Sequence, residues 1–401
     1  MEKFRVLELY SGIGGMHYAL KGELVPCRAV MLEFSESGLT LDDFNRLQFD
    51  MILMSPPCQP FTRIGLQGDV FDPRAKSFLY ILDLLPRLTK LPKFLLLENV
   101  KGFETSSARD ALVKTLRDCG YSYQEFLLSP TCLGIPNSRL RYFLIARATP
   151  GSFSFQTTAE VGWRFHTHTS DSSVTHVAMS GTRTGLSHMR CNTPVLEILE
   201  GFPKSEKGDS AAPVSDACAP SAGGDSSRVL YKMETVQDLE KKRLQDADES
   251  VRRIQDFLEE EEEEEEGGVR QSKEQYLLPP KTLLRYALLM DIVTPSCRRS
   301  VCFTKGYGHY VEGTGSVLQS CMDTQVETAF ASLDSLSEEQ KLVQLSKLGL
   351  RYFTPREIAN LMGFPAEFSF PEKTSTKQLY RVLGNSLNVL VVARLIALMV
   401  A

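Results

Sequence analysis

The chain has 401 residues, 42% of them hydrophobic and 24% charged, a composition typical of a soluble globular protein with room for more than one compact unit. Its formal net charge of −5 gives no global basic field, which argues only weakly against a nucleic-acid partner because a local basic cleft does not show in a net count. Nine cysteines are dispersed, with no CxxC pair and no His/Cys cluster at zinc spacing. We therefore expect no metal site, and free thiols in a reducing compartment, the cytoplasm or also the nucleus.

The first third of the chain alternates short apolar runs with helical patterns. Residues 4–9 (FRVLEL) predict a buried strand, followed at once by the glycine turn YSGIGG and a helix near Met16. The runs 51–54 (MILM) and 94–97 (FLLL) are too short for typical helices and predict two further buried strands. The remaining predicted elements are helices at 77–88 and 108–117 and strands at 121–128 and 140–146. This alternation predicts an α/β fold with a parallel sheet covered by helices on both faces.

The composition changes after residue 149. Residues 203–228 are rich in Ser, Gly, Pro, Ala and Asp and predict a flexible insertion. Apolar residues at helical spacing then predict an amphipathic helix, and a run of eight glutamates predicts a solvated loop. The apolar residues of that helix are Val236, Leu239, Leu244, Ala247, Val251, Ile254 and Phe257.

Order resumes in the last third of the chain. A helix opens at Pro279 and Pro280, and a second begins with a capping box at Thr354–Glu357 and stops at Gly363. The C-terminal stretch SLNVLVVARLIALMVA carries Asn and Arg and falls short of the ~20 residues of a membrane span. It predicts a packed terminal helix and no membrane partner.

Three marked segments follow predicted strands. They are YSGIGG after 4–9, SPPCQPF after 51–54, and ENV after 94–97. Alone, each has an ordinary structural reading: a packing turn, an inert cysteine in a rigid turn, and a helix cap. The carboxyl ends of parallel strands, however, share one edge of the sheet, where ligands bind. A glycine turn, a thiol and a carboxylate at one edge are suited to adding sulfur to an electron-poor pyrimidine ring and then alkylating that ring.

Five motifs, in order along the chain, resemble those of the S-adenosylmethionine-dependent cytosine-5 methyltransferases. They are LYSGIGG (9–15), PPCQ (56–59), ENV (98–100), RLR (139–141) and GNS (384–386). The stretch CRRSVCFTKGYGHYVEGTGSVL (297–318) resembles in particular the animal branch that acts on aspartate tRNA. The resemblance covers residues 1–30, about 38–148 and 276–396. It implies a Rossmann-like catalytic sheet with a smaller target-recognition domain.

The resemblance implies a role for each matching residue. Cys58 would add to carbon 6 of the target cytosine, and Glu98 would hold the ring nitrogen and the exocyclic amine. Arg139 and Arg141 would position Glu98 or the base carbonyl, although surface charge is the plain alternative. S-Adenosylmethionine is the implied cofactor, and the residues expected around it are Ile13, Gly14, Gly15, Ser55, Asn385 and Ser386. The target base must leave any stack to reach Cys58, so base flipping or an anticodon-loop substrate is implied.

The same resemblance divides the chain into four parts and names its partners. Residues 1–148 would form the catalytic and cofactor domain, 149–275 a variable insertion, 276–350 a target-recognition region, and 351–401 a segment returning to the catalytic domain. The expected function is transfer of a methyl group to cytosine carbon 5 in tRNA, with aspartate tRNA as the substrate, by a monomer. Two alternatives stay open: a DNA cytosine-5 methyltransferase, and a catalytically impaired RNA-binding variant.

One interval departs from the family pattern. Only about forty residues separate the glycine turn from the cysteine motif, and a βαβ unit alone takes ~30. One strand–helix–strand step therefore looks missing near residues 30–40. Glu33 either substitutes for the family's ribose-binding acid or lies beside a deletion. This shortening predicts weak or absent cofactor binding, and the loss of a strand would leave buried backbone groups unpaired unless neighbours close the gap.

Overall fold

The structure is a computed structural model that describes residues 4–22, 27–32, 40–57, 69–158, 160–162, 235–260, 273–331 and 333–401, with the backbone alone for 27–32 and 334. All of these belong to one compact unit, Met1–Arg164 with Val229–Ala401. The predicted flexible insertion at 203–228 and most of the glutamate run lie outside the described residues.

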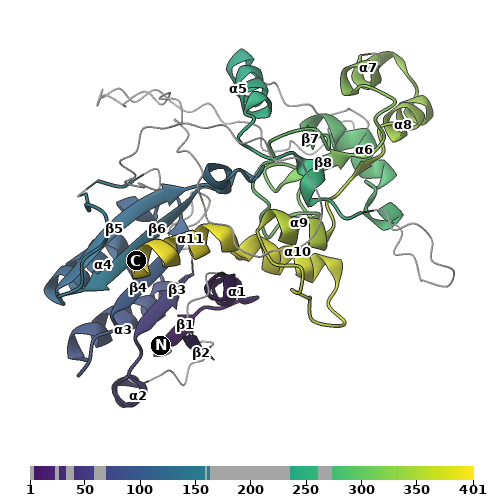
Figure 1. The fold of residues 1–401 in the computed structure, drawn as a ribbon. Coiled ribbons are helices and arrows are strands. Elements are labelled where there is room, and N and C mark those ends of the chain that lie inside the picture. The colour runs from purple at the N-terminus through teal and green to yellow at the C-terminus, as the bar shows by residue number, and fades with distance from the viewer. Residues whose placement is uncertain are drawn as a thin grey trace. The chain divides into compact units, whose positions relative to one another are not determined.

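The first third of the chain forms a six-stranded sheet (Figure 1). Its strands are β1 (Phe4–Leu9), β2 (Cys27–Leu32), β3 (Met51–Met54), β4 (Phe94–Val100), β5 (Tyr121–Leu128) and β6 (Arg141–Ala148), in the order β2-β1-β3-β4-β6-β5. The predicted strands are confirmed, with β4 three residues longer than expected. The parallel prediction fails at β6, which runs antiparallel to β4 and β5. The connection from β5 holds a 3-10 turn (η6, Pro130–Leu133) and no crossover helix, which a parallel return requires.

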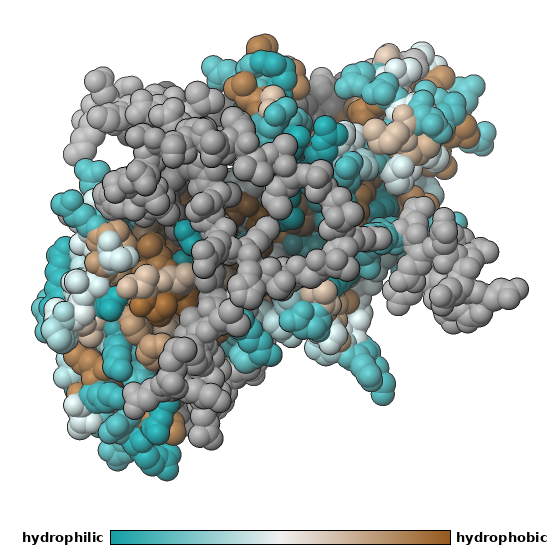
Figure 2. Space-filling model, in the orientation of Figure 1, coloured by the Kyte–Doolittle hydropathy of each residue, from teal (hydrophilic) through white to brown (hydrophobic). Residues whose placement is uncertain are grey.

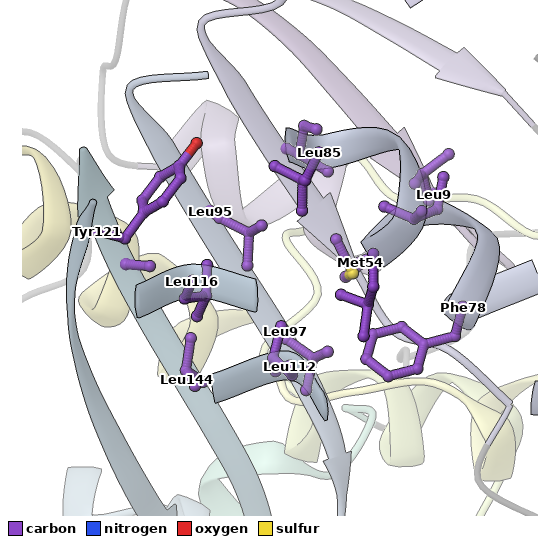
Figure 3. Close-up of a cluster of buried hydrophobic side chains, with 14 of the residues drawn as sticks. Leu9, Met54, Phe78, Leu85, Leu95, Leu97, Leu112, Leu116, Tyr121 and Leu144 are labelled. Carbon is purple, nitrogen blue, oxygen red and sulfur yellow. The ribbon is translucent and has the colours of Figure 1, made fainter. Parts of the chain in front are cut away.

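Helices cover both faces of the sheet. The helices of this part are α1 (Gly15–Gly22), α2 (Leu41–Leu47), α3 (Lys76–Leu84), α4 (Ser107–Asp118) and α11 (Val389–Val400). Alternate strand residues such as Leu9, Met54 and Leu97 point to one side and form a core with α2, α3 and α4 (Figure 3). On the other side α11 packs against α1, β4 and β6. The prediction of a helix-covered α/β sheet is therefore confirmed.

The shortened interval contains one strand among the described residues. This strand, β2, pairs with β1 over its whole length, from Phe4–Cys27 to Leu9–Leu32, and lies at the edge of the sheet. Since β3 pairs with the other side of β1, the interior ladder is continuous. The expected unpaired backbone is therefore not seen at β1, because the shortening falls at the sheet edge. Glu33 lies outside the described residues.

A smaller group of elements follows the insertion. It contains the sheet β7 (Asp291–Val293), β8 (Ser316–Gln319) and β9 (Leu350–Arg351), and the helices α5 (Val236–Ala247), α6 (Pro280–Tyr286), α7 (Val326–Phe330), α8 (Glu338–Ser346), α9 (Pro355–Leu361) and α10 (Thr376–Asn385). The capping box of Thr354 and Glu357 and the stop at Gly363 are confirmed at α9. The fourfold domain division stays a prediction.

The predicted amphipathic helix is shorter than expected and does not bury its apolar residues. Helix α5 ends at Ala247, and its residues Val236, Leu239 and Leu244 are exposed. The surface at α5 in Figure 2 is accordingly a mixture of brown and teal. The apolar residues beyond α5, Val251, Ile254 and Phe257, are buried, and the last two belong to a separate 3-10 turn (η7, Ile254–Phe257). The apolar residues at helical spacing are divided between α5 and the 3-10 turn that follows it. The spacing alone therefore could not predict the residue at which α5 ends.

The apolar C-terminal segment forms part of the core. Residues Thr376–Val400 are long and apolar enough to cross a membrane by length and composition alone. The segment is divided into α10 and α11 by Ser386–Asn388, and most residues of α11 are buried against the sheet layer. The prediction of a packed terminal helix is confirmed.

Candidate active site

The glycine turn after β1 bounds a cavity of about 130 Å³. Positive φ angles at Gly12 (53°) and Gly14 (79°) suit glycine, and the Gly14 N–H donates to the Ser11 carbonyl at 2.8 Å. The cavity is lined by Tyr10, Ser11, Gly12, Ile13, Gly15, Met16, Ser55, Glu98, Val382, Asn385, Ser386 and Leu387. The structure thus gathers five of the six residues expected around the cofactor: Ile13, Gly15, Ser55, Asn385 and Ser386. Gly14 shapes the turn without lining the cavity.

The C-terminal GNS motif packs directly against the glycine turn. A Cβ atom on Gly15 would lie 3.0 Å from Leu387 Cδ1 and 3.2 Å from Ser386 Oγ, so a larger residue would fit only if these side chains moved by a few tenths of an ångström. Ser55 also lines the cavity, and its hydroxyl donates to the Tyr10 carbonyl at 3.2 Å. Segments more than 300 residues apart in sequence therefore meet at the carboxyl end of β1.

Glu98 and Arg141 face each other beside this cavity. Glu98 pairs with Phe143 in the β4–β6 ladder, and Arg141 lies two residues along β6, on the same face of the sheet. Arg141 Nε is 3.6 Å from Glu98 Oε1, and Glu98 is 9% exposed. Burial raises the pKa of Glu98, and the opposing effects of Arg141 and Arg139 do not cancel that rise. The carboxyl group is therefore held closer to its protonated form than an exposed glutamate.

Arg139 contacts the backbone of two distant segments. Its side chain is 3% exposed, and Nη1 donates to the Phe303 carbonyl at 2.9 Å. Nη2 donates to the carbonyls of Gly384, at 3.1 Å, and Ser386. The predicted role of Arg139 in placing Glu98 or the base stays a prediction, since Arg141 is the arginine within salt-bridge distance of Glu98. Its hydrogen bonds to the carbonyls of Gly384 and Ser386 hold the GNS motif in place, and this contact is here called the clamp on GNS.

Asn99 ties the glutamate strand to the loop that carries the cysteine motif. This residue is 1% exposed, and its Nδ2 donates to the Pro56 carbonyl at 3.3 Å, two residues before Cys58. Its Oδ1 accepts from the Val100 N–H at 2.9 Å. The alternative that the Glu98–Asn99 pair forms a helix cap is wrong, because the residues that cap the two following helical segments are Gly102 and Ser106. Cys58 itself lies outside the described residues, so its role stays a prediction.

The Cys302 thiol lies beside Arg139 and Arg141, and the sequence analysis does not identify it. Cys302 Sγ accepts from Arg139 Nη1 at 3.4 Å and from Arg141 Nη2 at 3.7 Å. Burial alone would raise the pKa of Cys302, but the two guanidinium groups outweigh burial and lower it. The RLR motif identified the two arginines. It could not identify Cys302 as their shared partner, because Cys302 lies more than 160 residues away in the sequence.

Glu8, a buried residue of β1, makes the free energy of unfolding depend on pH. Burial raises the pKa of Glu8 to about 7, only partly offset by the backbone of His17. Between its unfolded value of 4.5 and 7, the unfolded chain releases this proton and the folded chain keeps it. The free energy of unfolding should therefore fall by about 3 kcal/mol from this group as pH rises through that window.

Urea denaturation between pH 4.5 and 8 measures this loss. Glu8→Gln removes the titrating group, so the variant should be the more stable protein at pH 8 by about 3 kcal/mol. Equal pH dependence in both proteins would contradict the assignment to Glu8.

Comparisons with known proteins agree with this geometry. The family model for C-5 cytosine-specific DNA methylase matches residues 31–400. The chain is 51% identical to the bovine and to the human proteins named tRNA (cytosine(38)-C(5))-methyltransferase, with all of each chain covered. The bovine alignment extends over 420 residues, more than the 401 of this chain, so relatives have residues without a counterpart here.

Solved structures give the same result. The DNMT2 variant of Spodoptera frugiperda superposes with a TM-score of 0.68 at 30% identity, with both chains fully covered. The Dnmt2 methyltransferase of S. pombe gives 0.63 at 30% identity, covering all of this chain and 98% of the other. With the family model, the full-length relatives and the Glu98–Arg141 site in agreement, the chain belongs to the C-5 cytosine methyltransferase family.

Proposed function

We propose that this protein transfers a methyl group from S-adenosylmethionine to carbon 5 of a cytosine in tRNA. The observation that carries the proposal is the buried Glu98, which lines the glycine-turn cavity and pairs with Arg141, in a chain 51% identical to proteins named for this reaction. Aspartate tRNA and its anticodon loop are the substrate we propose, since the 297–318 stretch resembles that branch. We further propose a monomer that works in the cytoplasm and also in the nucleus.

The chemistry proposed for the protein's own groups is the one that the family resemblance implies for Cys58 and Glu98. The Cys58 thiolate adds to carbon 6, and the electrons of the ring double bond become available at carbon 5. Glu98, whose raised pKa favours its protonated form, hydrogen-bonds the ring nitrogen as that nitrogen gains electron density. After carbon 5 is methylated, it loses its proton to water, the carbon–sulfur bond breaks, and the Cys58 thiolate leaves.

The residues around the cavity fit the amino-acid end of the implied cofactor. The glycine turn leaves open space beside Gly12, while Ser55, Asn385 and Ser386 supply polar groups around the cavity. When bound there, S-adenosylmethionine supplies an electrophilic methyl group. The acid that we propose for the cofactor ribose is Glu33, which stands in the shortened interval. We therefore expect weaker cofactor binding than in a chain with the full interval.

The shortened interval favours a second candidate, an RNA-binding variant without methyl transfer. A DNA methyltransferase is the third, because the chemistry at Cys58 is identical on either polymer. Transfer of a labelled methyl group to tRNA and to DNA separates all three: label in tRNA supports the proposal, label in DNA alone overturns it, and label in neither favours the RNA-binding variant. Calorimetric titration with S-adenosylmethionine tests the interval directly, and micromolar binding would show that the shortening does not weaken the site.

A further inference from the structure

Residues 303–316 form a tightly closed loop, here named the aromatic loop. Its two ends are joined by a hydrogen bond from the Thr304 N–H to the Thr314 carbonyl at 2.8 Å. The Tyr307 hydroxyl donates to the Ser316 carbonyl at 2.7 Å and accepts from the Phe353 N–H at 2.9 Å. Tyr307 is 3% exposed, so it anchors the loop from inside.

The base of the aromatic loop is fastened to the active-site edge. A Cβ atom on Gly384 would lie 2.1 Å from the Lys305 nitrogen, so the loop backbone rests directly on the first residue of GNS. The next two residues of that motif, Asn385 and Ser386, line the cavity. Arg139 holds both sides of this contact through the carbonyls of Phe303 and Gly384. The loop therefore has a fixed position beside the catalytic groups.

The outer side of the loop presents two aromatic rings. Tyr310 is 64% exposed, and the His309 ring lies against it with centroids 4.7 Å apart and an interplanar angle of 64°. The Tyr310 ring lies over Gly306, because a Cβ atom built on Gly306 would be only 2.8 Å from Tyr310 Cδ2. The backbone carbonyl of Tyr310 accepts a hydrogen bond from Thr314 Oγ1 at 2.8 Å. A large exposed ring held on both flanks loses little entropy when it binds.

We infer that Tyr310, supported by His309, stacks on an unpaired base of the substrate RNA next to the target cytosine. The inference rests on the proposed function, which requires a cytosine free of any duplex stack at this edge. Unpaired RNA bases are recognised by stacking on aromatic side chains, whereas bases inside a helix keep their faces covered. Since every base has such a face, Tyr310 contributes affinity and position, and leaves the choice of sequence to other contacts.

Binding of an RNA stem–loop, with cytosines unpaired in its loop, tests this inference. Tyr310→Ala should weaken binding by about five- to a hundredfold, and Tyr310→Phe, which keeps the ring, should stay close to wild type. With 2-aminopurine beside the target cytosine, wild type should quench the fluorescence on binding and Tyr310→Ala should not. Tyr80→Ala, at an exposed tyrosine on α3, is the matched control and should bind like wild type.

The possible failures are distinct. If wild type does not bind the RNA, the proposed function is overturned, and the stacking role falls with it. If wild type binds and Tyr310→Ala binds equally well with the same quenching, only the stacking inference is overturned. Equal weakening by Tyr310→Phe and Tyr310→Ala would assign the contact to the hydroxyl group and overturn stacking.

Discussion

Replacing Cys58 with alanine is expected to reduce the rate of methyl transfer to tRNA on the order of 10⁵–10⁶-fold, the loss typical of removing a catalytic nucleophile. Without the sulfur, carbon 5 of the cytosine has no route to the electron density that attacks a methyl group. RNA binding should be unchanged, because the substituted side chain supplies chemistry and not the recognition surface. Single-turnover transfer of a labelled methyl group measures the rate.

Cys119→Ala is the matched control for this substitution. Cys119 is the C-cap residue of α4, and burial raises the pKa of its thiol, so it is not activated as a nucleophile. Its removal should leave the transfer rate close to that of wild type. A Cys58→Ala protein that retains transfer would overturn the mechanism, since no other thiol is assigned to attack carbon 6.

Arg139→Ala should lower the free energy of unfolding by about 3–5 kcal/mol, because each buried carbonyl left without a partner costs about 1–3 kcal/mol. Three carbonyls lose the hydrogen bond from Arg139: those of Phe303, Gly384 and Ser386. Arg139→Lys should recover only part of the loss, since an ammonium group cannot reproduce the guanidinium fork. Urea denaturation measures the change.

Arg87→Ala provides the comparison at an exposed arginine. Arg87 pairs with Asp83 one helical turn away, with side chains 53% and 64% exposed, and such pairs contribute about 0.3–0.5 kcal/mol. If Arg139→Ala were no more destabilising than Arg87→Ala, the clamp on GNS would contribute nothing to stability. Loss of methyl transfer should accompany the destabilisation, because the clamped segment lines the cavity.

Local patterns in the sequence were enough to predict the elements that hold the site. Short apolar runs located β1, β3 and β4, and the capping box located α9, because burial and hydrogen bonding in those elements are decided within a few residues. The convergence of the glycine turn and Glu98 followed from strand ends sharing one edge. The five motifs placed Asn385 and Ser386 at the cavity by resemblance alone.

Other features depend on contacts that no local pattern encodes. The partners of Arg139 lie more than 160 residues away, and their backbone carbonyls leave no signature in the side-chain sequence. The antiparallel direction of β6 depends on the absence of a crossover helix between β5 and β6. The end of α5 depends on which of the apolar residues are buried by other parts of the fold. The shortened interval could be recognised in the sequence. Only the strand order shows that the interior pairing of β1 with β3 is kept.

Covalent trapping tests the central claim, attack of Cys58 on a tRNA cytosine, most directly. An RNA with 5-fluorocytidine at the target position can be attacked and methylated, but the fluorine cannot leave as the proton does, so the Cys58–carbon 6 bond persists. We predict a protein–RNA complex that survives denaturing electrophoresis with wild type and S-adenosylmethionine, and none with Cys58→Ala. A wild-type protein that methylates ordinary tRNA without forming this complex, or an equal complex with Cys58→Ala, would contradict the account.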